Sequence, residues 1–209
     1  MAVRDDTGRP MRRDAARNHQ LIVEAAREVL SEFGTDATME LIASRAGVGV
    51  GTVYRRFPNK EALVDELVHL ILGELDEAAT KALARGDGSG LEHFLRVLGQ
   101  SYSDHRGYAR ELVGRAGIER GADRLRRLID ELRRQAQEHG HIGPDISLGD
   151  VLATAWALRG IIETTGAVAP HAWKRHLDIH LAGLRSAGPP SDRPAVSTAD
   201  LVRISRSTS

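Results

Sequence analysis

One stretch of the N-terminal third combines apolar residues at helical spacing with Gly and Pro residues that interrupt them. The pattern predicts a helix over 39–46, which Thr38 caps because its hydroxyl can accept from the free amides of the first turn. Gly47 readily adopts the left-handed backbone that ends a helix. A second helix follows over 50–57, and Pro58 stops it. The stretch therefore predicts two short helices joined by a tight turn.

The second of these helices has two unlike faces. Val53 and Phe57 lie four residues apart and can point into a core together. The outer face suits the major groove of DNA, because Gly51 and Thr52 let the backbone approach and Arg55 can reach a base edge or a phosphate. An ordinary surface hairpin is the alternative, but it explains neither the Gly-Val-Gly turn nor the small outer face. The candidate DNA contacts on the helix pair are Arg45, Val50, Gly51, Thr52, Tyr54, Arg55, Arg56 and Lys60.

Several short motifs in this stretch resemble the DNA-binding signature of the TetR/AcrR family of transcriptional regulators. They are IA at 42–43, GV at 47–48, GTVY at 51–54, Phe57 and NKEAL at 59–63. The resemblance covers 18–67 and implies an all-helical homodimer. Its first three helices would bind double-stranded operator DNA, and the remaining helices would bind a small molecule and the partner subunit.

Three positions depart from the pattern of the family. Arg56 stands where many members have His, a change that keeps a cation for phosphate, and Gly49 stands where many have Ser. Glu40 lies where some members place a cation, and its repulsion of phosphate leaves it outside the predicted site.

Helical periodicity continues through most of the chain, and we expect an all-α fold. Apolar stripes predict a first helix over 14–33, a long one over 59–85 after the helix pair, and five more in the second half. These five are expected at 91–105, 108–116, 122–139, 148–168 and from Pro170 to 187. The expected organisation is a disordered basic arm at 1–13, a helix-turn-helix domain at 14–58, a ligand-binding and dimerisation domain at 59–187 and a disordered tail at 188–209. The arm could lie along DNA or make no contact, and both alternatives stay open.

Composition narrows the class of protein further. The 209 residues include 29 Lys and Arg and 29 Asp and Glu, so the net charge is zero. The positions of the basic residues, and not the net charge, therefore indicate DNA binding. The absence of cysteine excludes disulfides, thiolate catalysis and cysteine-based zinc sites. No apolar run approaches the ~20 residues that span a bilayer, so we expect a cytoplasmic protein without membrane contact. No catalytic set and no phosphate-binding loop is evident, and we expect neither an enzyme nor a cofactor.

Polar side chains on otherwise apolar helices of the second half are candidates for an effector site, although packing within the core would also explain each of them. The candidate ligand-binding residues are His93, Tyr102, Tyr108, Trp156, Glu163 and Thr164. Their aromatic neighbours favour an apolar or aromatic small molecule. His176 and His180 have the i, i+4 spacing of metal ligands and His171 lies near, but no third ligand is in register, so we predict no metal.

The sequence is best interpreted as a ligand-responsive transcriptional regulator, a repressor that a small molecule releases from a near-palindromic operator. One alternative is a DNA-binding dimer that acts as an activator or answers to a protein partner, without a small-molecule effector. An enzyme that merely carries a helix-turn-helix is the other alternative, and no local motif supports it.

Overall fold

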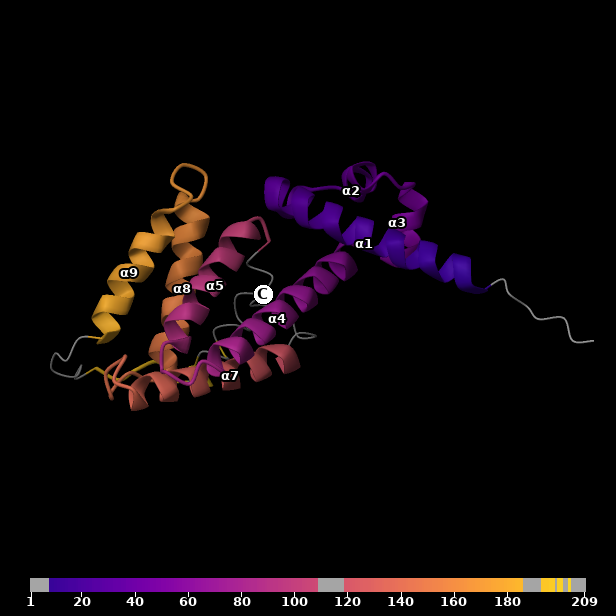
Figure 1. Ribbon diagram of the computed structural model, residues 1–209. Coiled ribbons are helices and arrows are strands. Elements are labelled where there is room, and N and C mark those ends of the chain that lie inside the picture. Colours follow the sequence, from indigo (N-terminus) through magenta and orange to yellow (C-terminus); the bar gives the residue numbers. More distant parts are fainter. Residues whose placement is uncertain (1–7, 109–118, 186–192, 198, 201–202, 204–209) are drawn as a thin grey trace, which may run out of the picture. The chain divides into compact units, whose positions relative to one another are not determined.

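The computed structural model describes residues 8–108, 119–185, 193–197, 199–200 and 203, and this part of the chain contains helices and no strands (Figure 1). The helices are α1 Gly8–Phe33, α2 Met39–Ala46, α3 Val50–Arg56, α4 Lys60–Leu83, α5 Gly90–Asp104, α7 Glu119–Glu138, α8 Leu148–Thr165 and α9 Ala172–Arg185, with a 3-10 turn at Gly34–Asp36. The predicted all-α class is confirmed. None of the described helices combines the length and the apolar character needed to cross a membrane.

The chain divides into two compact units, with the boundary between Leu67 and Val68. The first unit is built on α1, which packs against α2. Ile22 and Leu30 of α1 and Val53 of α3 are at most 1% exposed, so they form a core behind the helix pair. The stripe that the sequence predicts on α1 is therefore the face that holds the hairpin in place.

The helix α1 begins at Gly8 and not at 14, so residues 8–13 are helical where a disordered arm was predicted. Pro10 falls in the first turn of the helix, where a missing N–H breaks no hydrogen bond. Residues of good helix propensity follow it directly. A Pro in the first turn is thus compatible with the longer α1. Residues 1–7 of the predicted arm lie outside the described part of the chain.

The turn between α2 and α3 follows the local signals of the sequence. The hydroxyl of Thr38 accepts from the backbone N–H of Leu41 at 3.2 Å, which confirms the predicted cap of α2. Gly47 has a φ of 67°, and its N–H donates to the carbonyl of Ser44 while the N–H of Val48 donates to that of Ala43. This pair of bonds is the Schellman arrangement, which ends a helix at a left-handed glycine.

The helix α4 starts where the Asn59 side chain accepts from the backbone N–H of Ala62 at 2.8 Å. Its first two turns belong to the first unit and the rest to the second, because the boundary falls after Leu67. At about 1.5 Å per residue, its 24 residues make a helix of roughly 36 Å. One continuous helix therefore belongs to both units.

The second unit packs α5, α7, α8 and α9 around a core that includes Phe94, Leu132 and Leu158, each fully buried. Close packing of α5 on α9 depends on Gly99, since a Cβ there would lie 2.4 Å from the Trp173 ring. The predicted helix 108–116 falls, apart from its first residue, on residues outside the described part of the chain.

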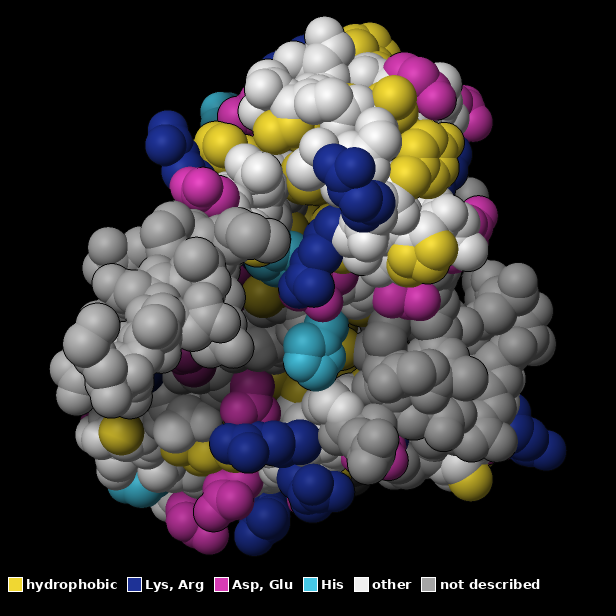
Figure 2. Space-filling view, turned by 90° about the vertical axis from the view of Figure 1, so that its right-hand side faces the viewer, with side chains coloured by type: hydrophobic (Ala, Val, Ile, Leu, Met, Phe, Trp, Pro, Cys, Tyr) yellow, Lys and Arg dark blue, Asp and Glu magenta, His cyan; other side chains and the backbone are white. Residues whose placement is uncertain are grey.

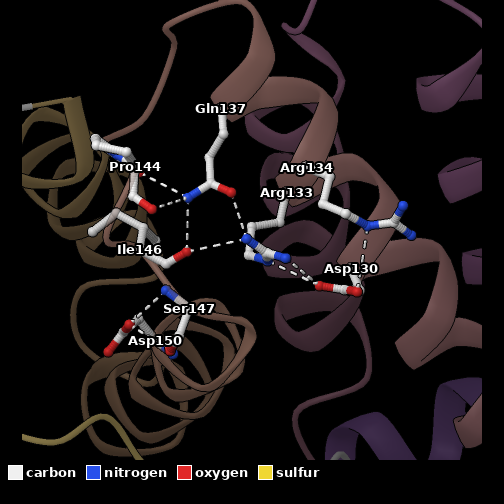
Figure 3. Close-up of polar contacts among 9 residues, drawn as sticks. Asp130, Arg133, Arg134, Gln137, Pro144, Ile146, Ser147 and Asp150 are labelled. Carbon is white, nitrogen blue, oxygen red and sulfur yellow. Dashed lines mark hydrogen bonds and ion pairs between the residues drawn. The ribbon is translucent and has the colours of Figure 1, made fainter.

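A group of polar contacts fixes the loop between α7 and α8 (Figure 3). The Gln137 amide donates to three backbone carbonyls of this loop, those of Gly143 at 2.9 Å, Pro144 at 2.9 Å and Ile146 at 3.1 Å. Ser147 and Asp150 then cap α8 reciprocally, because each side chain accepts from the backbone N–H of the other residue. We name Gln137 and these three carbonyls the loop clamp.

Two predictions near the C-terminus are wrong. The helix α8 ends at Thr165, three residues before the predicted end, and α9 begins at Ala172 and not at Pro170. Gly166, a poor helix former, follows α8, and Pro170 lies in a turn in which the N–H of Ala172 bonds to the carbonyl of Ala169.

The predicted disordered tail also includes described residues. Residues 193–197 lie without helical structure, and the Val196 carbonyl packs against Gly149 of α8, where a Cβ would be 2.1 Å from that oxygen. This contact holds the segment close to the N-terminal turn of α8.

Candidate nucleic-acid interface and interior polar cluster

The outer face of α3 is a surface of mixed chemistry. Val50 is 39% and Tyr54 44% exposed, whereas Val53 on the opposite side is fully buried. Gly51, Arg55 and Arg56 are exposed, and Thr52 is half-buried. In the upper part of Figure 2, basic and acidic side chains stand among hydrophobic and other uncharged ones. Such a surface combines cations for phosphates with apolar and hydroxyl groups for base edges.

The side chain of Arg55 lies along this face, because its Nη2 donates to the Thr52 hydroxyl at 3.0 Å. The contact leaves the other N–H groups of the guanidinium available for a base edge. A Cβ placed on Gly51 would meet no atom within 4 Å, so no packing within the protein accounts for a glycine at this position.

Arg45, a predicted DNA contact, is held by carboxylates of α1. Its guanidinium pairs with Glu28 and Glu32 at 3.3 Å each. The hydrogen bond that Arg45 donates to Glu28, followed by the one that it donates to Glu32, raises the pKa of Arg45 above its usual value. The two ion pairs join α2 to α1, so Arg45 would have to give up these partners before it reached a phosphate.

Lys60, another predicted DNA contact, is also engaged within the protein. Its ammonium group donates to the carbonyls of Thr35 and Ala37, the latter at 3.3 Å. Both carbonyls belong to the connection between α1 and α2. Lys60 therefore secures that connection from the start of α4, and its carbonyl partners compete with any phosphate.

Arg56 has a partner that the sequence did not reveal. Its Nε donates to Nδ1 of His19 at 3.1 Å, and Nε2 of the same imidazole lies 3.4 Å from Glu66 of α4. The His19 ring also stacks on Phe57, with centroids 5.7 Å apart. Sequence reasoning missed this set because 37 residues separate His19 from Arg56, and no local pattern joins them.

In the second unit, three polar residues on α5 and α8 form an interior cluster. Nε of Arg159 and Oε1 of Glu163 form an ion pair at 3.7 Å, and about a fifth of each side chain is exposed. Burial of the Tyr102 side chain is the main reason that the pKa of its phenol is raised to about 12. The Arg159 guanidinium opposes this rise in pKa, and the Glu163 carboxylate adds to it. Nε of Arg159 is buried and has no hydrogen-bond partner among the described residues. We name Tyr102, Arg159 and Glu163 the interior cluster.

The other ligand candidates lie in different environments. Trp156 is half-buried, and Tyr108 is buried with its ring edge-on to His105 at 5.5 Å. His93 and Thr164 are exposed, and the Thr164 hydroxyl donates to a carbonyl of its own helix. The structure thus places two of the six candidates, Tyr102 and Glu163, in the interior cluster and adds Arg159.

The rings of His176 and His180 approach to 4.4 Å, and burial, aided by His176, lowers the pKa of His180. Within the residues that the structure describes, no group of three or more His, Asp or Glu side chains could hold a metal ion.

The described residues are helical and present a short exposed helix from a helix-turn-helix, an arrangement typical of DNA-binding regulators. Residues 22–67 match the model of the bacterial regulatory proteins of the tetR family, and residues 87–186 match that of the SbtR-like transcriptional regulators, C-terminal domain. The chain therefore belongs to the TetR family of bacterial transcriptional regulators.

Solved structures of the same family cover most of the chain. A TetR regulatory protein from Mycobacterium vanbaalenii is 28% identical, with a TM-score of 0.62 over 85% of this chain and 100% of that one. The TetR regulator SCO0520 from Streptomyces coelicolor is 32% identical, with a TM-score of 0.61 over 81% of this chain and 99% of that one. Among curated proteins, the HTH-type transcriptional regulator YhgD from Bacillus subtilis is 45% identical over 65 residues, which span 31% of this chain and only 34% of that relative.

Proposed function

We propose that this protein is a repressor that binds a near-palindromic DNA operator as a homodimer and leaves it when a small molecule binds the second unit. The observation that carries the proposal is the outer face of α3, where exposed Val50, Tyr54 and Arg55 surround a glycine that no internal packing requires. A helix with this surface can enter the major groove, with Arg55 at base edges and Tyr54 and Arg56 at phosphates.

In the proposal, Arg45 and Lys60 act on DNA binding mainly through the fold. Both hold α2 in place behind α3, as their partners on α1 and on the α1–α2 connection indicate. Either residue would add a phosphate contact only by exchanging these partners. Substitution of Lys60, whose bond to the Ala37 carbonyl is partly buried, should therefore lower the stability of the first unit together with DNA affinity, whereas the exposed ion pairs of Arg45 add little to stability.

Two copies of the chain would place two α3 helices in successive major grooves, about 34–36 Å apart along the duplex. The last two helices, α8 and α9, are the proposed contact between subunits, as the family resemblance implies. Ile179 on α9 supports this assignment, because this large apolar side chain is 57% exposed in the single chain. A regulator of this kind would act in the cytoplasm, where its DNA lies.

The interior cluster is the proposed polar centre of the effector site. Arg159 Nε is buried and has no hydrogen-bond partner among the described residues, so it can donate to a ligand oxygen, and the un-ionised Tyr102 phenol offers a second donor. The apolar helices around the cluster would hold the apolar or aromatic body of the ligand. Because α4 belongs to both units, its displacement would couple the two sites, and each ligand would weaken the binding of the other by the same factor.

The test is selection of duplexes by the full chain from a random pool of about 30 base pairs, which is long enough for two half-sites. We expect one near-palindromic sequence, bound as a dimer with an affinity that falls linearly in log salt. Transcription in vitro from a promoter that overlaps this sequence should decrease when the protein is added. Selection of no sequence would contradict the proposal, and increased transcription would identify an activator.

A further inference from the structure

We propose that His19 is a positioning residue for DNA binding. It would hold the guanidinium of Arg56 and the end of α3 in the binding arrangement and connect them to α4 through Glu66. The inference rests on the proposed function and deepens it, because it assigns the residues that orient one phosphate contact. We name Glu66, His19 and Arg56 the imidazole relay.

The hydrogen bond from Arg56 determines which imidazole nitrogen of His19 carries the proton. Nε of Arg56 always carries hydrogen and donates to Nδ1 of His19 at 3.1 Å, so Nδ1 must be the acceptor. The proton of the neutral ring then resides on Nε2, which faces a Glu66 carboxylate oxygen at 3.4 Å. The hydrogen bond from Arg56 to His19 therefore has a defined direction, and the other ring nitrogen of His19 faces Glu66.

The relay joins three helices at one side chain. His19 comes from α1, Arg56 is the last residue of α3, and Glu66 lies in the second turn of α4. Phe57, which directly follows α3, is buried and stacks on the His19 ring at 5.7 Å with 29° between the planes. The ring is thus fixed by packing on one face, while its two nitrogens fix the polar groups on either side.

Exposure of these groups argues for an orienting role and against a stabilising one. The side chains of His19 and Glu66 are 26% and 35% exposed, and Arg56 is exposed. Ion pairs and hydrogen bonds at such exposure add little to folding stability. An arginine held at Nε, however, loses less rotamer freedom when it binds a phosphate, so the gain appears in DNA affinity.

The geometry leaves the phosphate-binding end of Arg56 available. Among the described residues, only its Nε has a hydrogen-bond partner, and both Nη groups remain open to a phosphate. Movement of α4 away from α1 would separate Glu66 from His19 and release the ring, and with it Arg56. The relay would in this way make the orientation of α3 sensitive to α4 within the first unit.

The test compares variants that remove the polar groups or keep them. His19→Phe keeps a ring against Phe57 but loses the hydrogen bond from Arg56 and the contact with Glu66, whereas His19→Gln keeps one acceptor and one donor. With the duplex selected by the unmodified protein as the probe, we expect His19→Phe to weaken binding about tenfold without a change in the thermal midpoint. His19→Gln should restore most of the affinity.

A double-mutant cycle with Arg56→Ala separates positioning from a direct effect. If His19 acts through Arg56, His19→Phe causes no further loss of affinity in the Arg56→Ala background. Additive losses, or a lowered midpoint for His19→Phe that His19→Gln shares, would overturn the relay while the proposed function stands. Failure of the unmodified protein to select any duplex would overturn both.

Discussion

Replacement of Gly51 by Ala separates the needs of the fold from those of DNA binding. Gly51 is the second residue of α3, is exposed, and has open space where a Cβ would stand. Alanine is the better helix former by up to ~1 kcal/mol, and near a helix end we expect about 0.5 kcal/mol of added stability. For a chain of this length, that corresponds to a rise of about 1–2 °C in the thermal midpoint.

The same methyl group should weaken DNA binding. It extends about 1.5 Å beyond Cα, whereas hydrogen bonds to bases tolerate only a few tenths of an ångström. Loss of one base contact amounts to about 1–3 kcal/mol, or about 5- to 150-fold in affinity. Fluorescence anisotropy with the selected duplex measures this loss, and differential scanning calorimetry measures the midpoint.

Gly73→Ala is the matched control. Gly73 is an exposed glycine inside α4 with equally open space at its Cβ position, so its replacement should raise stability and leave DNA affinity unchanged. If Gly51→Ala raised the midpoint and bound the duplex as well as the unmodified protein, the outer face of α3 would not be the surface that approaches DNA.

Two other predictions concern the second unit. Gln137→Ala removes the donors of the loop clamp and should lower the free energy of unfolding, measured in urea, by about 1–3 kcal/mol. The control Gln100→Ala loses one exposed contact with Asp104 and should change that free energy by no more than about 0.5 kcal/mol. Equal losses in the two variants would contradict the loop clamp. Folding stability should fall as the pH rises from 10 to about 12, because the unfolded chain releases the Tyr102 proton there and the folded protein, with its raised pKa, keeps it. The difference between a pKa of 10.0 in the unfolded chain and about 12 in the folded protein corresponds to about 3 kcal/mol, so the stability of Tyr102→Phe should be less sensitive to pH by that amount. Equal pH profiles of stability for the two proteins would show that the phenol is not buried.

The helix-turn-helix could be predicted closely from the sequence because its signals are local. Thr38 caps α2 by accepting from an N–H three residues away, Gly47 takes the left-handed conformation where that helix ends, and Pro58 follows the second helix. Such features depend on one turn of backbone and on the residue type. The all-α class followed in the same way from apolar periodicity.

The roles of individual site residues could not be predicted because they depend on tertiary contacts. Arg45 has a carboxylate partner 17 residues away and Lys60 a carbonyl partner 25 residues away, and both looked like surface cations in the sequence. The predicted starts of two helices near a Gly or a Pro were also wrong, those of α1, which begins at Gly8, and of α9, which begins after Pro170. A Pro can be the first residue of a helix or lie in the turn before it, and the sequence alone does not distinguish the two.

Selection repeated with Arg55→Ala would show whether the outer face of α3 reads base sequence. We expect the variant still to bind duplexes but to lose base preference at matching positions of both half-sites, because Arg55 reaches base edges. Arg134→Ala, an exposed arginine of α7, removes the same charge elsewhere and should select the unmodified sequence. If Arg55→Ala selected that sequence with undiminished preference, the recognition surface would lie elsewhere on the protein.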